Sequence, residues 1–600
     1  MAVLALGLAG LAYPGADLAA LAVRQSPGSL LPGGQLPWLH VAHPGTGLPY
    51  IADAEDRRVI LRGVVSGGLV DYWSGVDARS LRPPPFHPID PAAYEGGRCP
   101  PNSATVWQPP LCRSDIEQMA ALGFNVLRLA LSWSLLEPEP GRYDRLYLDR
   151  IAQVVAWARE AGIYVILDMH ENAYSRYFQR EAPPLLPGGS PTSLNQHTGA
   201  PAWAVATAGL PSEVYFGQRE FNPAVGAAFT SFWLNTPVAA PAGQAPGQGL
   251  QDHYIGALST LARRFAADSS VVGYGVFNEP WPGFVAPPLF EDLLLFPFYR
   301  RVVDALTGAA DGLSCPASWP AIPACGYPDL GIHDRHHLFF LEPDHLREQT
   351  DLLTHLPMPI SSYGNLVYSI HAYTHKFTLD ALAGQDPRRT AYPPGGFELS
   401  YASAEAEARA AGAALFVSEF GNEPEQDGLL LANQLRQQER HQVGGTLWPW
   451  KENCTLTTSW GVYEGVYSGH ADQRCAYDRP PPPDVAPKSQ NGCLRPGRER
   501  LLARVWPRAA AGRINSYAYD PDSGGFQFRA SGRAGMPDTV FLIPKQVRGA
   551  VSVSGAGVVR ALNQEPDGSR LLRVAPQGGD YRVAVAPAQL ALTSCPSTTT

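Results

Sequence analysis

Between about residues 58 and 451, short apolar runs rich in β-branched residues alternate with stretches that have helical apolar spacing. The runs lie at 59–65, 125–131, 164–170, 271–277, 337–341, 365–371, 414–419 and 444–448. Continuous apolar runs are typical of parallel strands, because such strands are buried on both faces. The pattern therefore predicts an α/β chain in which parallel strands alternate with helices.

Helix boundaries separate these runs, with helices expected at 114–122, 146–161, 252–267 and 290–306. The first helix begins at Ser114, a favourable N-cap residue, and the first two end before Gly123 and Gly162. Eight strands that alternate with helices over roughly 390 residues fit a (β/α)8 TIM barrel with loop insertions. The alternative is a doubly wound open sheet, which is disfavoured because no run is followed by G-x-G-x-x-G.

The C-terminal part of the chain has a different pattern. Short alternating runs separated by turn residues predict a smaller β-sandwich domain at 508–590. The catalytic barrel would then occupy 31–500, with the Pro-rich tract 479–484 as a surface loop or linker. Within 1–30, an apolar stretch reads as a signal-peptide remnant, and a disordered N-terminus is the alternative.

Charge excludes some partner classes. The formal net charge is −9 and the chain contains no run of Lys or Arg. Binding to nucleic acid requires a concentrated basic surface, so we expect no nucleic-acid partner. Electrostatic docking to an anionic lipid surface is disfavoured for the same reason.

The eight cysteines include no C-x-x-C pair, which disfavours zinc-site and thioredoxin-type readings. Most of them lie in Pro/Gly-rich stretches, where a disulfide would restrain a long loop. Free buried thiols are the alternative. Disulfides would place the protein in an oxidising compartment, so we expect it to be secreted. The plausible pairs are Cys99–Cys112, Cys315–Cys325, and Cys454 with Cys475 or Cys493.

Polar residues gather where five of the predicted strands end, and in a TIM barrel these ends form the active-site mouth. They are His170, Asn278 with Glu279, His371, Glu419 and Trp448. Glycoside hydrolysis with retention requires two carboxyl groups roughly 5–5.5 Å apart. The short motifs Asn278-Glu279-Pro280 and Ser418-Glu419-Phe420-Gly421 are each common in loops when taken alone. Here Glu279 ends predicted strand four and Glu419 ends predicted strand seven, and these two strands lie across a barrel from each other. We therefore predict Glu279 as acid/base and Glu419 as nucleophile, with Arg128 supplying a nearby positive charge.

The segments around these residues resemble glycoside hydrolase family 5, and endoglycoceramidases in particular, over roughly residues 55 to 590. The resemblance implies a barrel with a C-terminal β-sandwich that cleaves the bond between an oligosaccharide and the ceramide of a glycosphingolipid, without metal or cofactor. The matching segments are Asn278-Glu279-Pro280, Ser418-Glu419-Phe420-Gly421, 131–138, 141–144, 164–170, 199–203, 299–301, 448–451 and 506–509.

The resemblance also implies roles for residues that would bind the sugar or the nucleophile. Asn278 would bind the sugar 2-hydroxyl, His170 would line the −1 subsite and Trp448 would stack under the sugar. Three further residues would surround Glu419. Arg128 would hold it in place, and Tyr373, in the His-x-Tyr motif that begins at His371, would donate a hydrogen bond to it.

Two positions depart from the family pattern. Endoglycoceramidases typically have His-Gln-Asp after the third strand, whereas this chain has His170-Glu171-Asn172. The family's Asn and Lys after the first strand are also missing, since this chain has Val65 and Asp71-Tyr72-Trp73 there. Because Asn172 removes a charged acceptor for sugar hydroxyls, the sequence leaves open whether glucose or galactose is preferred next to ceramide.

Two other functions remain as alternatives. One is a family 5 β-glucosidase or glucanase that acts on steryl or other β-glucosides, and the other is a non-catalytic glycolipid-binding protein. The presence of both carboxylates disfavours the latter. The apolar segment 289–298 after the acid/base strand allows two interpretations: an exposed wall for acyl chains, with transient contact to a membrane surface or micelle, or the buried face of a helix.

Overall fold

The structure is a computed structural model. It describes residues 35–70, 89–96, 110–178, 199–215, 220–238, 247–309, 322–352, 354, 362–373, 378–383, 397–421, 427–452, 461–464, 493–494 and 496–593.

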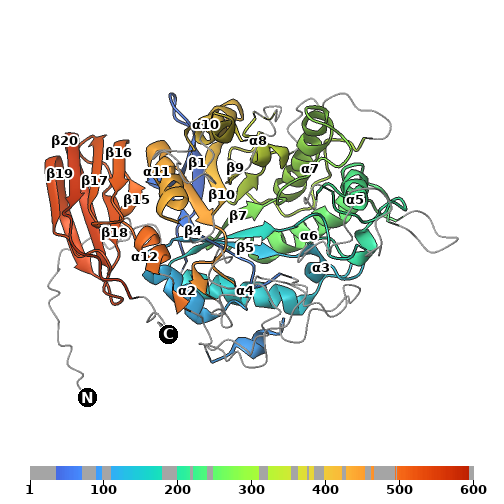
Figure 1. Cartoon of the computed structure of the whole chain (residues 1–600), viewed down its shortest axis with the longest axis horizontal. Helices are drawn as coiled ribbons and strands as arrows, with labels where there is room; N and C mark the ends of the chain where they lie inside the picture. The colour runs from blue at the N-terminus through green and yellow to red at the C-terminus, as the bar shows by residue number, and fades with distance from the viewer. Residues whose placement is uncertain are drawn as a thin grey trace, which may run out of the picture.

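A closed eight-stranded parallel barrel forms the centre of the larger part of the molecule (Figure 1). Its residues are almost entirely buried, which explains why each strand reads as a continuous apolar run. The predicted (β/α)8 barrel is therefore confirmed. In order around the barrel, the strands are β4 (Arg62–Ser66), β5 (Val126–Leu131), β6 (Tyr164–Met169), β7 (Val271–Gly275), β8 (Leu338–Leu341), β9 (Leu366–Ala372), β10 (Ala414–Phe420) and β11 (Gly444–Leu447).

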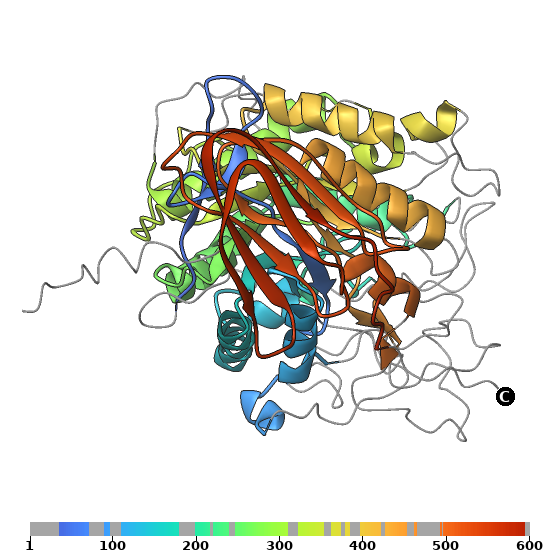
Figure 2. The ribbon, with the colours of Figure 1, turned by 90° about the vertical axis from the view of Figure 1, so that its left-hand side faces the viewer.

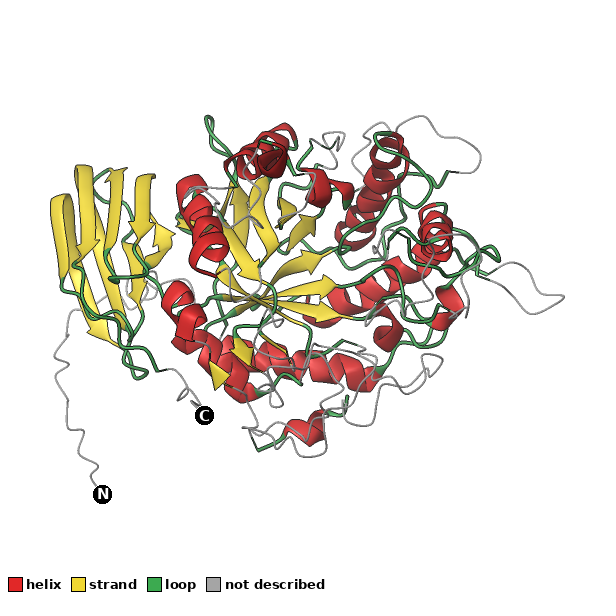
Figure 3. Ribbon diagram, viewed as in Figure 1, coloured by secondary structure: helices red, strands yellow, loops and turns green. Residues whose placement is uncertain are grey.

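Helices enclose the barrel strands, as the red ribbons around the yellow strands show (Figure 3). The four helices predicted from sequence occur within two residues of the expected starts, except the last. The α-helices around the barrel are α2 (Arg113–Ala121), α3 (Trp133–Leu136), α4 (Arg145–Glu160), α5 (Pro223–Trp233), α6 (Leu250–Phe265), α7 (Phe296–Thr307), α8 (Leu346–Thr350), α9 (Leu379–Leu382), α10 (Glu398–Ala410) and α11 (Ala432–His441).

The helix expected at 290–306 begins with a π-helical turn, η3 (Glu291–Leu295), and continues as α7. Leu294, Leu295, Phe296 and Phe298 are all buried in the barrel core. Of the two interpretations of segment 289–298, the buried helix face is therefore the one that holds for these residues. Only Leu289, before the helix, is strongly exposed, at 58%.

An antiparallel sheet of nine strands lies beside the barrel and faces the viewer in Figure 2, consistent with the predicted C-terminal β-sandwich. Three of its strands come from the N-terminal part of the chain, so the sheet is built from more than residues 508–590. Along the sheet the strands are β1 (Leu39–Ala42), β2 (Tyr50–Asp53), β3 (Arg58–Val59), β15 (Trp506–Ala510), β18 (Thr539–Ile543), β20 (Arg570–Val585), β17 (Phe526–Gly532) and β16 (Arg513–Tyr519), with β19 (Val551–Gln564) beside β20.

The apolar run predicted as one strand at 59–65 divides between the two sheets. Val59 pairs antiparallel with Ala509 of β15, whereas Gly63 pairs with Val126 inside the barrel. Residues 59–65 are buried in both sheets, so their apolar composition does not show where the second sheet ends and the barrel begins. The short connection ties the first barrel strand directly to the second sheet.

A buried ion pair lies where α11 meets the second sheet. Arg504 donates to one carboxylate oxygen of Glu439, and the backbone N–H of Tyr519 donates to the other. Arg504 and Glu439 are 2% and 4% exposed. Removing one partner of such a pair leaves an uncompensated buried charge.

Glu439→Ala is therefore expected to lower the free energy of unfolding by about 3–5 kcal/mol, measured by urea denaturation. Glu405→Ala is the control, because Glu405 makes its ion pairs with Arg409 and His441 at the surface. That change is expected to cost less than about 1 kcal/mol. Equal losses in the two variants would contradict the structural role of the buried pair.

Several predictions fall outside the described residues, namely those for 1–30, for Asp71-Tyr72-Trp73 and for 479–484. The predicted partners Cys99 and Cys315 also lie there. Within the part of the chain that the structure describes, no helix is both long enough and apolar enough to cross a bilayer.

Candidate active site

The polar strand-end residues predicted from sequence meet at the C-terminal mouth of the barrel. Arg128 of β5 lies at the centre of this group and is fully buried. Its Nη1 donates to Glu419 Oε1 at 2.5 Å. Its Nη2 lies 2.9 Å from both Asp168 Oδ1 and Asn278 Oδ1 and 2.8 Å from Glu342 Oε1. One guanidinium group thus cross-links four barrel strands or the loops that follow them.

The predicted nucleophile, Glu419, is fixed at both carboxylate oxygens. Arg128 binds Oε1, and the Tyr373 hydroxyl donates to Oε2 at 3.0 Å. The Glu419 side chain is 5% exposed. The cation of Arg128 favours the carboxylate form of Glu419, and the two donors together fix the orientation that nucleophilic attack requires.

The predicted acid/base, Glu279, follows β7 and is more open, with 13% of its side chain exposed. One of its carboxylate oxygens lies within 4.8 Å of one from Glu419. That separation fits the retaining geometry of roughly 5–5.5 Å and is too short for the roughly 6.5–9.5 Å of inverting enzymes. His371 Nδ1 lies 3.0 Å from Glu279 Oε1.

Glu279 has an unusual backbone conformation, with a φ of 45°. A left-handed non-glycine residue carries strain, which persists only where neighbouring groups hold it. Glu342 provides such a restraint, since its Oε2 accepts the Glu279 backbone N–H at 2.8 Å. Its Oε1 accepts from Arg128 and lies 3.1 Å from His371 Nε2. Glu342 therefore connects the predicted acid/base to the cation that holds the predicted nucleophile.

Sequence reasoning missed Glu342 and Asp168. Asp168 ends β6, accepts from Arg128, and lies 3.0 Å from His170 Nδ1. Glu342 directly follows the predicted strand 337–341, so the strand-end rule that selected His170 would also have selected it.

Glu342→Gln is expected to lower kcat/KM on an aryl β-glycoside by about 100-fold, because small misplacement of reacting groups has effects of this size. The amide keeps the shape of the side chain but removes the charge that pairs with Arg128 and His371. Steady-state kinetics with a parallel thermal unfolding curve test this. A folded variant with wild-type kcat/KM would show that Glu342 is not needed to position Glu279 or Arg128.

Electrostatics around the two glutamates favour a charged imidazole at His371. Burial disfavours the imidazolium, but the carboxylates of Glu342, Glu419 and Glu279 outweigh it and raise the pKa of His371 well above its ordinary value. Burial raises the pKa of the Glu419 carboxyl, and the charges of His371 and Arg128 oppose that shift. The imidazolium form is thus favoured at His371, whose Nδ1 lies 3.0 Å from Glu279 and 3.7 Å from Glu419.

The remaining predicted sugar contacts flank this centre. His170 and Trp448 stack with their ring centroids 5.4 Å apart and an interplanar angle of 4°. Asn278 donates through Nδ2 to the Glu171 carbonyl while its Oδ1 accepts from Arg128, so its amide orientation is fixed. Asn172 is half-buried in the loop after β6, and its Oδ1 is buried without a hydrogen-bond partner among the described residues.

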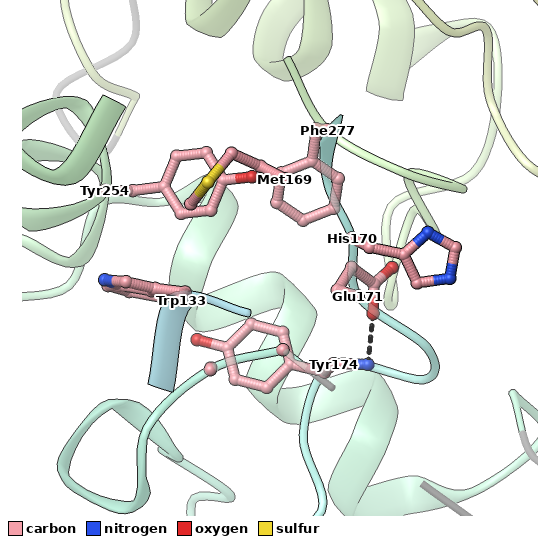
Figure 4. Close-up of a pocket in the computed structure, with 9 residues that line it drawn as sticks. Trp133, Met169, His170, Glu171, Tyr174, Tyr254 and Phe277 are labelled. Carbon is pink, nitrogen blue, oxygen red and sulfur yellow. Dashed lines mark hydrogen bonds between the residues drawn. The ribbon is translucent and has the colours of Figure 1, made fainter. Parts of the chain in front are cut away.

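A small pocket is lined in part by His170 and Glu171 (Figure 4). Its wall is mainly apolar, and Glu171 turns one carboxylate oxygen to the Tyr174 backbone N–H. Sugar hydroxyls would lose hydrogen bonds there, so we place the sugar at the mouth and not in this cavity. The cavity is lined by Trp133, Met169, His170, Glu171, Tyr174, Gly199, Ala200, Tyr254 and Phe277.

Two groups of side chains in the site have the spacing of metal ligands, Glu279 with His345 and Glu348, and Glu279 with His371 and Glu419. Within each group a histidine is already paired with a glutamate, and we assign no metal ligand among them. The expectation that catalysis requires neither metal nor cofactor stays a prediction.

A closed parallel barrel with two facing glutamates at its mouth defines a glycoside hydrolase. The family model described as Cellulase (glycosyl hydrolase family 5) matches residues 94–285. Endoglycoceramidase I of Rhodococcus hoagii (strain 103S) is 25% identical over 480 residues, which cover 78% of this chain and 79% of that protein. Residues 94–285 of the chain therefore match the family 5 model, and the chain resembles endoglycoceramidase I over most of its length.

Solved structures agree with this assignment. The crystal structure of endogalactoceramidase is 27% identical, has a TM-score of 0.64, and is matched over 92% of this chain and 100% of that chain. The lactosyl-enzyme intermediate of endo-glycoceramidase II from Rhodococcus sp. has a TM-score of 0.60 at 23% identity, over 90% and 99% of the two chains. The second likeness shows a shared fold.

Proposed function

We propose that the protein is an endo-acting retaining β-glycosidase that releases an intact oligosaccharide from the ceramide of glycosphingolipids. The observation that carries the mechanism is the separation of less than 4.8 Å between carboxylate oxygens of Glu279 and Glu419. The likeness to endoglycoceramidase I across 78% of the chain supports the substrate class.

The geometry supports a double displacement. Glu279 donates a proton to the glycosidic oxygen while Glu419 Oε1 or Oε2 attacks the anomeric carbon, which releases the ceramide and forms a glycosyl-enzyme ester. Glu279, now a carboxylate, then takes a proton from water, which attacks the same carbon and frees Glu419. Arg128 and Tyr373 stabilise the carboxylate of Glu419 before attack and again after hydrolysis.

Exposed apolar side chains near the acid/base loop support a lipid leaving group and transient contact with a micelle or membrane surface. Phe284 and Leu289, on the segment that follows Glu279, are 61% and 58% exposed. Phe221 is 46% exposed and packs edge-on against Trp281, with centroids 5.6 Å apart. Apolar side chains at a mouth of this kind suit acyl chains.

A panel of defined substrates tests the proposal: a ganglioside, lactosylceramide, glucosylceramide, galactosylceramide, a steryl glucoside and a cello-oligosaccharide. Mass spectrometry should find intact oligosaccharide and ceramide from the ganglioside. Early NMR spectra of the released sugar should show the β-anomer. Cleavage of only the steryl glucoside or the cello-oligosaccharide would overturn the substrate class, and an α-anomer would overturn retention.

We also propose that the protein is secreted and contains disulfides. No cysteine among the described residues is free, Cys112 and Cys325 included, which supports disulfides and an oxidising compartment. Labelling of the unreduced, denatured protein with a maleimide tests this, and mass spectrometry should find no label on either residue. Labelled Cys112 and Cys325 in protein recovered from culture medium would contradict the disulfide proposal.

A further inference from the structure

Two charged side chains that follow β8, His345 and Glu348, have polar atoms within 4.8 Å of the Glu279 carboxylate, and the double displacement assigns them no role. His345 Nδ1 lies 3.8 Å from Glu279 Oε2 and 3.0 Å from Glu348 Oε2. Glu348 Oε2 also lies 3.7 Å from Nδ1 of His371, the other imidazole beside Glu279. The two histidines and two glutamates thus alternate in charge around a closed ring.

This ring is tied to the acid/base loop and shielded from water. The His345 and Glu348 side chains are 5% and 9% exposed. The His345 backbone N–H donates to the Pro280 carbonyl at 3.1 Å, and the Trp281 ring packs against the imidazole with centroids 5.8 Å apart. Charges in such a poorly hydrated place interact more strongly than at the surface.

His345 carries a positive charge at neutral pH. Burial disfavours its imidazolium, but the carboxylates of Glu348 and Glu279 outweigh burial and raise the pKa of His345 to about 10. Glu279 therefore lies between two imidazolium groups, His345 and His371. Two cations favour the carboxylate form of an acid, and the first step of the reaction requires the protonated form.

Glu348 supplies the opposing charge, because its Oε2 approaches both imidazoles and one of its oxygens lies within 4.8 Å of Glu279. Other groups of the mouth act on the same site but belong to the reaction centre or to its supports. The groups that face Glu279 or His345 from the surrounding elements are Glu342 just after β8, His371 of β9, Tyr373 just after β9, Glu419 of β10, and Glu220.

We propose that His345 and Glu348 are a pair of positioning residues that balance the charge around Glu279, so that its carboxyl group can act first as acid and then as base. The inference rests on the proposed retaining glycosidase function. It assigns Glu348 to the acid step, because its charge favours a protonated Glu279. It assigns His345 to the base step, because its charge favours the carboxylate.

The two single variants are therefore expected to change the pH profile in opposite directions. Glu348→Gln should move the basic limb of kcat/KM to lower pH by about one unit, and His345→Asn should move it to higher pH by a similar amount. Glu348→Gln should also slow an alkyl β-glycoside, which requires acid assistance, more than a dinitrophenyl β-glycoside, which does not. The double variant should return the limb toward its wild-type position.

The experiment measures kcat/KM against pH for both substrates with the full-length protein, together with thermal unfolding of each variant. Glu405→Gln is the matched control, since Glu405 also pairs with a histidine, His441, but on the outer helices. Opposite limb shifts that cancel in the double variant would support the inference. Limbs that stay in place, shift in the same direction or show additive losses would overturn it.

The same data separate this inference from the proposed function. A wild-type protein that hydrolyses neither aryl nor lipid glycosides would overturn the glycosidase itself and the inference with it. Normal wild-type turnover with unshifted variant profiles would overturn only the role of His345 and Glu348.

Discussion

Replacing Glu419 with Gln is expected to lower kcat by at least about 10⁴-fold while the protein stays folded. An amide cannot form the glycosyl-enzyme ester, so the first displacement stops. Folding should persist because Arg128 keeps its ion pairs with Asp168 and Glu342 when the charge of Glu419 is removed. The measurement is kcat on an aryl β-glycoside, with circular dichroism and thermal unfolding as folding checks.

A matched control for this change is Glu117→Gln on α2, where the side chain is 63% exposed and pairs with Arg113 on the same helix. That variant should retain wild-type kcat. A 2-fluoro glycoside should also label the wild-type protein, and peptide mapping should place the label on Glu419. Substantial turnover by folded Glu419→Gln, or a label on another carboxylate, would remove Glu419 as the nucleophile.

Replacing Glu279 with Ala is expected to affect substrates according to their leaving groups. Glycosides with poor leaving groups should lose about 10²–10⁴-fold in kcat/KM, because general acid assistance contributes an effect of that size. A dinitrophenyl glycoside needs no proton, so its first step should continue. Its glycosyl-enzyme should then accumulate, because no base activates water, and KM should fall with kcat.

Added azide separates this defect from loss of folding. Azide needs no general base, so it should attack the accumulated intermediate of Glu279→Ala and yield a β-glycosyl azide. The same addition should leave Glu419→Gln inactive through this route, because no intermediate forms there. Equal losses for both leaving groups and no effect of azide would contradict the assignment of Glu279 as acid/base.

The barrel could be predicted from sequence because burial on both faces marks each of its strands. The run 59–65 shows the limit of this signal, since its first residue belongs to β3 of the second sheet and its later residues to β4 of the barrel. Apolar composition indicates that a residue is buried but does not indicate which sheet or helix it packs against. For the same reason, 289–298 allowed both an exposed wall and a buried helix face, and the structure buries Leu294, Leu295, Phe296 and Phe298 in η3 and α7.

The site was predicted only in part. Glu279 and Glu419 were found because they end strands four and seven, and Arg128 because it lies in strand two. Glu342 was overlooked, although it ends the fifth strand. His345 and Glu348 carried no comparable signal, because they follow β8 in a short helix whose approach to Glu279 depends on how the loops pack.

The sequence by itself therefore determined the barrel, the two glutamates at its mouth and the chemistry that two such groups perform. Strand order is encoded locally by apolar periodicity, and the strand ends of a closed parallel barrel must meet. Only the tertiary structure decided the distance between Glu279 and Glu419, the clamp of Glu342 on the acid/base and the charge ring with His345 and Glu348. These contacts join residues far apart in the chain through side-chain packing, for which local sequence has no signal.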